Sequence, residues 1–274
     1  MRRRNDLYVR LAPLLRCPSC GAAAMTPVTR AFHCGACGHD APEHNGWFDF
    51  LGGAAQSELS RPSLGQRLFL ASLSARLYAA HRESPGMWLL TGHTFSDEAR
   101  WLSDALAARS DGVVLDVPCG QGNFTAAIAR RLRGGAVIGV DLSDRQLDLA
   151  ARRLRHDRID NVLLLRASAL DLPLADGAMD AVSDCGGLHL YPDVPRAIGE
   201  MARVLEPGRA VAGLTFLGHR GIVDRLERAV AGPLGVRTFD FDELGAQFEA
   251  VGFERWRHHG RGLIGWFTAS KARG

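Results

Sequence analysis

The chain has 274 residues, of which 46% are hydrophobic and 23% charged, an ordinary composition for a globular protein. This length suffices for one large domain and a small one. The formal net charge is only +3, and Lys271 is the one lysine, so no strong overall field favours nucleic acid. No apolar run approaches the ~20 residues that span a bilayer, so we expect a cytoplasmic protein with no membrane span.

Four of the six cysteines form two C-x-x-C pairs, Cys17 with Cys20 and Cys34 with Cys37, and glycine follows each pair. Four such thiolates can hold one tetrahedral zinc ion. Two disulfides or a redox pair are alternatives, although a reducing compartment disfavours disulfides. The pattern resembles a zinc ribbon, and it predicts a small zinc-ribbon domain over residues 1–52. Because so small a module has little core, we expect the zinc to be structural.

Beyond the second cysteine pair, an Asn45-Gly46 turn and an apolar run predict a strand that leaves the ribbon. A glycine-rich linker follows, and residues 58–92 carry apolar side chains at helical spacing. Residues 53–95 are therefore predicted to be a linker and a helical segment. Ser96-Asp97-Glu98 is typical of the start of the next helix.

Strands and helices alternate in the rest of the chain. Apolar runs predict strands near residues 113–117, 136–140, 162–166, 179–184 and 209–216, with helices between them, as a parallel sheet requires. Helical stretches follow within residues 219–250, and two more strands are expected near 253–259 and 263–270. This order predicts an α/β fold with a doubly wound sheet.

The most informative stretch runs from Val113 to Phe124. Three apolar residues lead into Asp116, and a turn with two glycines then opens a helical segment. Glycines let backbone N–H groups approach a ligand closely, and a helix N-terminus favours a negative group. Asp141 ends the next predicted strand, where an acid can accept hydrogen bonds from ribose hydroxyls. The spacing is not G-x-G-x-x-G, so a nucleoside fits better than a dinucleotide.

These residues resemble motif I of the class I S-adenosylmethionine-dependent methyltransferases, with Pro118 where that family usually has its first glycine. Segments 168–180, 181–189, 200–209 and 242–271 extend the resemblance, which is closest to the group that includes the ubiquinone/menaquinone-biosynthesis methyltransferases. The resemblance implies a seven-stranded Rossmann-like methyltransferase sheet over residues 96–274, completed by an antiparallel pair. It also implies that residues 53–95 form a lid over the acceptor pocket, with a plain packing helix as the alternative.

The resemblance further implies S-adenosylmethionine as cofactor. The loop from Pro118 to Gly122 and Asp116 would face its methionine part, Asp141 its ribose and Leu142 its adenine, although Asp116 also fits a helix-capping acid. The full implied set of cofactor-binding residues is Asp116, Pro118, Gly120, Gly122, Asn123, Asp141, Leu142, Ser168, Ala169, Leu170 and Cys185.

Methyl transfer from a sulfonium is an in-line displacement, and alignment of the reactants can be worth roughly 7–11 kcal/mol. An acceptor that must lose a proton needs a base, and His189 is our candidate because the ordinary pKa of histidine is near neutrality. A histidine that only shapes the pocket is the alternative. His93, His219 and Tyr191 are weaker candidates.

Three functions fit these features. The first is methyl transfer to a small molecule, such as a natural product or a quinone-like ring. The second is methylation of rRNA at guanine N1, with the ribbon holding RNA, but Arg30 is the one basic side chain other than histidine in residues 21–45. The third is a non-catalytic cofactor-fold protein whose ribbon binds another protein. We favour the small-molecule acceptor.

Overall fold

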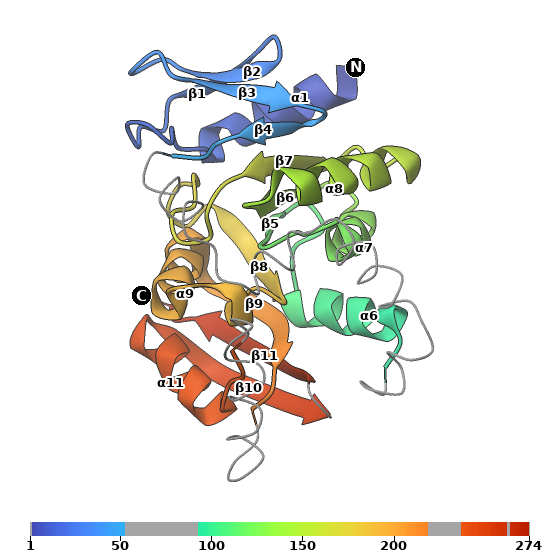
Figure 1. Cartoon of the computed structure of the whole chain (residues 1–274), viewed down its shortest axis with the longest axis vertical. Helices are drawn as coiled ribbons and strands as arrows, with labels where there is room; N and C mark the ends of the chain where they lie inside the picture. Colours follow the sequence, from blue (N-terminus) through green and yellow to red (C-terminus); the bar gives the residue numbers. More distant parts are fainter. Residues whose placement is uncertain (1, 53–92, 219–236, 262–263, 274) are drawn as a thin grey trace.

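The structure is a computed structural model, and it describes residues 2–52, 93–218, 237–261 and 264–273 (Figure 1). The strands of the ribbon are β1 (Met25–Val28), β2 (Ala31–Cys34), β3 (Asp40–His44) and β4 (Trp47–Asp49). The strands of the larger domain are β5 (Val113–Asp116), β6 (Ala136–Asp141), β7 (Val162–Arg166), β8 (Met179–Cys185), β9 (Leu205–Phe216), β10 (Phe253–Arg261) and β11 (Ile264–Lys271). All eleven form one sheet in the order β1-β2-β3-β4-β7-β6-β5-β8-β9-β11-β10.

The seven strands of the larger domain confirm the predicted doubly wound α/β fold. Strands β7, β6, β5, β8 and β9 are parallel neighbours, and β11 and β10 complete the sheet in antiparallel pairing. Strand β9 begins at Leu205, earlier than the predicted residue 209, because Leu205 already pairs with Met179. The register shifts after that pair, next to Gly208, whose φ of +77° is a conformation that glycine adopts readily.

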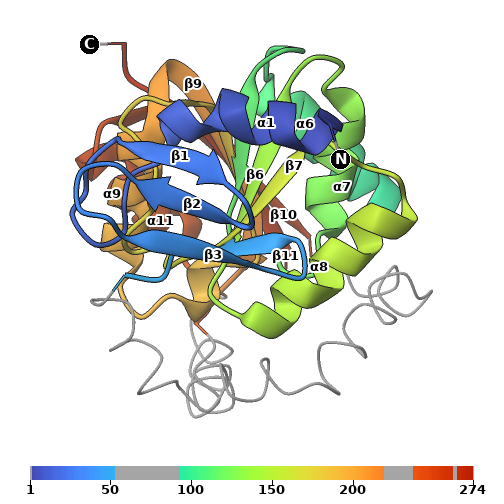
Figure 2. The ribbon, with the colours of Figure 1, turned by 90° about the horizontal axis from the view of Figure 1, so that it is seen from above.

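Helices cover both faces of this sheet (Figure 2). They are α1 (Arg2–Leu11), α6 (Phe95–Leu106), α7 (Asn123–Arg131), α8 (Asp144–His156), α9 (Val194–Val204) and α11 (Phe241–Ala250). Helices α6, α7 and α8 bury one apolar layer, and α9 and α11 bury the other. Helix α6 starts just before the predicted Ser96, because Thr94 and Asp97 form a reciprocal capping box at its first turn.

The ribbon is an extension of the large sheet. Strand β4 pairs in parallel with β7, with Phe48 opposite Leu165, so the ribbon covers what would otherwise be an exposed edge (Figure 1). Phe32 packs against Phe48 and Phe50 with ring centroids 4.8 and 5.7 Å apart, and all three belong to the same cluster of buried residues as the apolar face of α9. The ribbon therefore shares its core with the larger domain.

The predicted Asn45-Gly46 turn joins β3 to β4, and both residues have positive φ, 54° and 101°, as a two-residue hairpin turn requires. The predicted linker and lid, residues 53–95, lie outside the described residues as far as residue 92, as does the first of the two helical stretches predicted within 219–250, because 219–236 are not described. Within the part of the chain that the structure describes, no helix combines the length and apolar character needed to cross a membrane.

Candidate functional site

The four cysteines of the ribbon converge on one point. The Sγ atoms of Cys17 and Cys37 are 3.6 Å apart, those of Cys20 and Cys34 are 3.7 Å apart, and all four lie within 4.8 Å of one another. A tetrahedron with metal–sulfur distances of about 2.3 Å has edges of about 3.8 Å. The four thiols are free and not joined as disulfides. Their geometry therefore fits one tetrahedral metal ion.

Each cysteine pair forms the same turn. The Gly21 N–H donates to the Cys17 carbonyl at 2.9 Å, and the Gly38 N–H donates to the Cys34 carbonyl at the same distance. The two glycines have φ of 73° and 76°, a left-handed conformation that costs other residues energy. This explains the glycine that follows each C-x-x-C pair. The two pairs are thus matched knuckles, each presenting two thiols to one centre.

The predicted cofactor loop lies where the carboxyl ends of β5, β6 and β8 meet at one edge of the sheet. There the Gly120 N–H donates to Asp141 Oδ2, and the Ser143 N–H donates to Asp141 Oδ1, both at 2.9 Å. Burial raises the pKa of Asp141 to about 6, although these N–H groups work in the opposite direction. The acid that ends β6 thus fixes the position of the glycine loop.

The loop leaves an open space above Gly120. Gly120 has a φ of +51°, and a Cβ built there meets nothing within 4 Å. At Gly122, by contrast, a Cβ would lie 3.2 Å from the Cβ of Ala150 on α8, so this glycine allows close packing. Several of the predicted cofactor residues are partly exposed: Pro118, Gly120, Asn123, Leu142, Ala169, Leu170 and Cys185. A cradle of this kind, beside a buried carboxylate, fits a nucleoside group.

Asp116 faces the protein interior. It is 1% exposed, and its two oxygens accept from Thr125 Oγ1 at 2.5 Å and from Ser183 Oγ at 2.9 Å. Burial raises its pKa to about 6. Asp116 therefore joins the end of β5 to the start of α7 and to β8. This placement matches the helix-capping alternative, in which Asp116 holds the loop in shape.

The other predicted cofactor residues lie on the loop that follows β7. The Ala167 N–H donates to the Asp141 carbonyl at 3.2 Å, which brings this loop beside the ribose candidate. Ser168 is 2% exposed, and its Oγ accepts from the Leu170 N–H at 3.0 Å. Ser168, Ala169 and Leu170 thus form a tight turn next to Asp141.

His189 lies in the short 3₁₀ turn Leu188–Leu190 after β8. Its ring packs edge-on against Phe216 at a centroid distance of 4.5 Å, and its buried Nδ1 has no hydrogen-bond partner among the described residues. Burial lowers the pKa of His189 to about 4, so its imidazole is neutral at neutral pH. Of the weaker candidates, His93 packs edge-on against Trp266, and His219 lies outside the described residues.

The residue pattern did not single out Asp184, which is fully buried in β8. Its Oδ1 accepts from the N–H groups of Gly187 and Leu188 at 3.0 and 3.3 Å. A Cβ on Gly187 would collide with Asp184 Oδ2, the Tyr191 hydroxyl and Pro118, so these groups surround one point. Burial raises the pKa of Asp184 to about 7. The sequence did offer one signal for Asp184, an acid at the end of an apolar strand. Burying a carboxylate costs free energy, so such a residue is a candidate for a functional role.

Comparisons with known proteins identify the kind of domain in which these residues lie. Residues 114–208 match the family described as a methyltransferase domain. The demethylmenaquinone methyltransferase of Lactiplantibacillus plantarum is 41% identical over 101 residues, which are 36% of this chain and 43% of that protein. An uncharacterized chloroplastic methyltransferase of Arabidopsis thaliana is 27% identical over 213 residues, 76% of this chain and 60% of that one. The chain thus spans about half the length of the curated relatives it matches.

Solved structures share the fold at lower identity. The [4+2]-cyclase SpnF has a TM-score of 0.63 and 18% identity, over 78% of this chain and 98% of its own. The fold and the sequence matches both indicate a methyltransferase domain. Residues 114–208 thus match a methyltransferase domain, and the chain is similar in sequence to ubiquinone/menaquinone-type methyltransferases, which supports a class I S-adenosylmethionine-dependent methyltransferase domain.

Proposed function

We propose that this protein transfers a methyl group from S-adenosylmethionine to a small, quinone-like acceptor. The observation that carries the proposal is the contact between Gly120 and Asp141 beside an open cradle, inside the matched domain. Relatives named as demethylmenaquinone and 2-phytyl-1,4-naphtoquinone methyltransferases support the class of acceptor.

Asp141 is suited to hold the ribose. Each of its oxygens accepts one backbone N–H, and a carboxylate offers about four lone-pair sites, so capacity remains for two hydroxyls. The turn at Ser168–Leu170 would line the adenine, and the loop from Pro118 to Gly122 the methionine end. S-adenosylmethionine supplies a methyl group carried on a positively charged sulfur. Holding the acceptor in line with that group is the main task of the protein.

On the acceptor side, we assign proton removal to His189. With S-adenosylmethionine bound as the source of the methyl group, the neutral imidazole of His189 would take the hydroxyl proton of the acceptor as its oxygen is methylated. The lowered pKa of His189 keeps the ring neutral at all pH values well above 4, but it also makes the ring a weaker base than an ordinary histidine. The buried Nδ1 without a described partner supports this role.

We further propose that Cys17, Cys20, Cys34 and Cys37 hold one structural zinc ion. Four sulfurs complete a tetrahedral shell and leave no open position for chemistry. A reducing compartment keeps such thiols free to bind a metal, which is consistent with a cytoplasmic location.

Cofactor binding is tested by calorimetry with S-adenosylhomocysteine. Asp141→Ala should weaken binding by roughly 1.5–3 kcal/mol, because the ribose loses hydrogen bonds to a charged group. Asp144→Ala, which removes an exposed acid from the first turn of α8, is the matched control and should bind normally. Failure of the unaltered protein to bind would remove the methyltransferase function altogether.

The acceptor is tested with labelled cofactor against a panel of reduced quinones and phenols, with total RNA in parallel. Label in the quinones or phenols supports the proposal, and label in RNA alone would overturn it. With a responsive acceptor, His189→Ala should lower turnover and leave cofactor affinity nearly intact. A rate that falls as the pH is lowered through about 7 in the unaltered protein, with no such dependence in Asp184→Asn, would instead assign proton removal to Asp184.

A further inference from the structure

The loop between β7 and β8, residues 167–178, joins the cofactor site to the zinc ribbon. Its first residues contact Asp141 and form the turn at Ser168. Its later residues contact the ribbon: the Arg16 N–H donates to the Pro173 carbonyl at 2.9 Å, and the Ala175 N–H donates to the Leu14 carbonyl at 2.8 Å. One loop thus has one end at each site.

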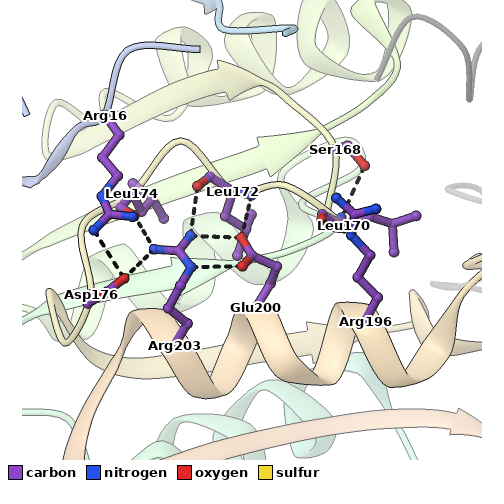
Figure 3. Close-up of polar contacts among 9 residues, drawn as sticks. All are labelled: Arg16, Ser168, Leu170, Leu172, Leu174, Asp176, Arg196, Glu200 and Arg203. Carbon is purple, nitrogen blue, oxygen red and sulfur yellow. Dashed lines mark hydrogen bonds and ion pairs between the residues drawn. The ribbon is translucent and has the colours of Figure 1, made fainter. Parts of the chain in front are cut away.

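Arg203 on α9 holds this loop from the other side (Figure 3). Its guanidinium donates to the Leu172 carbonyl at 2.9 Å and to the Leu174 carbonyl at 2.6 Å. It donates twice to Glu200 and once to Asp176, each at 2.7 Å. These contacts use all five donors that an arginine has. Glu200 also accepts from the Leu172 N–H at 2.7 Å. Arg203 and Glu200 together therefore bond both the carbonyl and the N–H of Leu172.

The ribbon also contacts Asp176, through the residue that precedes Cys17, one of the proposed metal ligands. Arg16, which precedes Cys17, reaches Asp176 at 3.3 Å, so Arg16 and Arg203 share one carboxylate (Figure 3). Leu15 forms an antiparallel bridge with Leu174, and both side chains are fully buried. The loop is therefore clamped between a strand-like segment of the ribbon and the Arg203–Glu200 pair.

We propose that Arg203 is a positioning residue for the cofactor: with the first zinc knuckle, it holds loop 167–178 so that Ser168–Leu170 can line the adenine. This inference rests on the proposed cofactor site. Among the contacts of the described residues, none joins Arg203 to a residue assigned to the cofactor. Its effect runs through the loop backbone and reaches the turn at Ser168, where Arg196 on the same helix also donates to the Leu170 carbonyl at 2.8 Å.

The physical basis is preorganisation. A site formed in only a fraction of the molecules binds with an apparent Kd raised by the inverse of that fraction. Lysine has three donors where arginine has five, so Arg203→Lys must leave at least two of the five acceptors without their present partner. We therefore expect the loop of this variant to sample other arrangements while the positive charge is kept.

The first test measures S-adenosylhomocysteine binding by the full-length, zinc-loaded protein. Arg203→Lys should raise Kd roughly 5- to 20-fold. With a responsive acceptor, it should raise KM for the cofactor and leave kcat nearly unchanged. Arg109→Lys is the matched control, because Arg109 bonds the buried Asp180 and the partly exposed Glu206, at 2.7 and 2.9 Å, and not the carbonyls of Leu172 and Leu174. Equal weakening in both variants would show general destabilisation and overturn the proposal.

The second test needs no cofactor. Hydrogen exchange of the zinc-loaded protein should show faster exchange at the amides of Leu172 and Ala175 in Arg203→Lys and normal exchange in Arg109→Lys. Removal of the metal with a chelator should speed exchange at Ala175, which bonds the ribbon. Unchanged exchange at both amides would refute the clamp. If the unaltered protein fails to bind S-adenosylhomocysteine, the proposed function fails, while the exchange result still decides whether Arg203 and the knuckle hold the loop.

Discussion

The buried carboxyl group of Asp184 offers a sharp test of how burial changes the charge of this domain. Asp184 is 0% exposed, and its Oδ1 accepts from two backbone N–H groups, which Oδ1 of an asparagine could also accept. The Tyr191 hydroxyl also faces this carboxyl group and lowers its pKa, but burial outweighs that effect. Asp184→Asn therefore keeps the shape and the two backbone hydrogen bonds while it removes the ionisation. Any change of stability with pH in this variant, relative to the unaltered protein, reports the Asp184 proton.

The size of the effect follows from the two pKa values. In the unfolded chain an aspartate loses its proton near pH 3.9, whereas in the folded protein Asp184 keeps it until about pH 7. Between these values the native state binds more protons, so stability falls as pH rises. Each pKa unit is worth about 1.36 kcal/mol, so the full penalty is about 4 kcal/mol above pH 7, of which about 3 kcal/mol develops between pH 5 and 8.

Urea unfolding at pH 5, 6, 7 and 8 measures this difference. The stability of Asp184→Asn should rise relative to the unaltered protein by about 3 kcal/mol between pH 5 and 8. Asp176→Asn is the control: Arg203 lowers the pKa of that exposed acid, so it is ionised throughout this range and should show no such trend. A difference that stays constant between pH 5 and 8 would mean that native Asp184 is already ionised at pH 5, and the argument from burial would be wrong.

Three more outcomes are expected. Metal analysis of protein prepared without chelator should give one zinc per chain, and a value near zero would contradict the four-sulfur site. Gly187→Ala should cost about 1–3 kcal/mol in urea unfolding, because its methyl group would overlap Pro118, Tyr191 and Asp184. Gly120→Ala should cost only about 1–2 kcal/mol for its left-handed backbone, yet it should weaken S-adenosylhomocysteine binding clearly, because its methyl group would point into the cradle. Normal binding by Gly120→Ala would place the cofactor elsewhere.

Local patterns in the sequence predicted much of this fold. Apolar runs located the strands of the larger domain to within a few residues, because buried parallel strands read as continuous apolar segments. The two cysteine pairs with their glycines predicted the knuckles, since spacing and backbone conformation are local properties. The acid of Asp141 and the glycine loop were likewise found from their places at the end of a strand and the start of a helix.

Contacts between distant segments were not predictable in this way. Nothing near Phe48 indicates that it pairs with Leu165, and nothing near Arg203 shows that its guanidinium meets the carbonyls of Leu172 and Leu174. Asp116 shows the same limit at the site. A family pattern assigns it to the cofactor side, but its oxygens accept from Thr125 and Ser183, two hydroxyls brought near by the tertiary fold.

The ribbon and the larger domain share one core. We therefore expect the larger domain to lose stability when the chain is cut at the predicted boundary, residue 52. Removal of residues 1–52 would expose the edge of β7 and uncover the apolar layer that Phe48 and Phe50 now seal. An unpaired, apolar edge strand promotes association. We therefore expect a chain of residues 53–274 to aggregate in size-exclusion chromatography and to unfold at lower urea concentration. Zinc removal from the intact chain is the comparison, because it leaves β4 in the sequence. A truncated chain that stays monomeric and unfolds cooperatively at the original urea concentration would show that the larger domain needs no cover for β7.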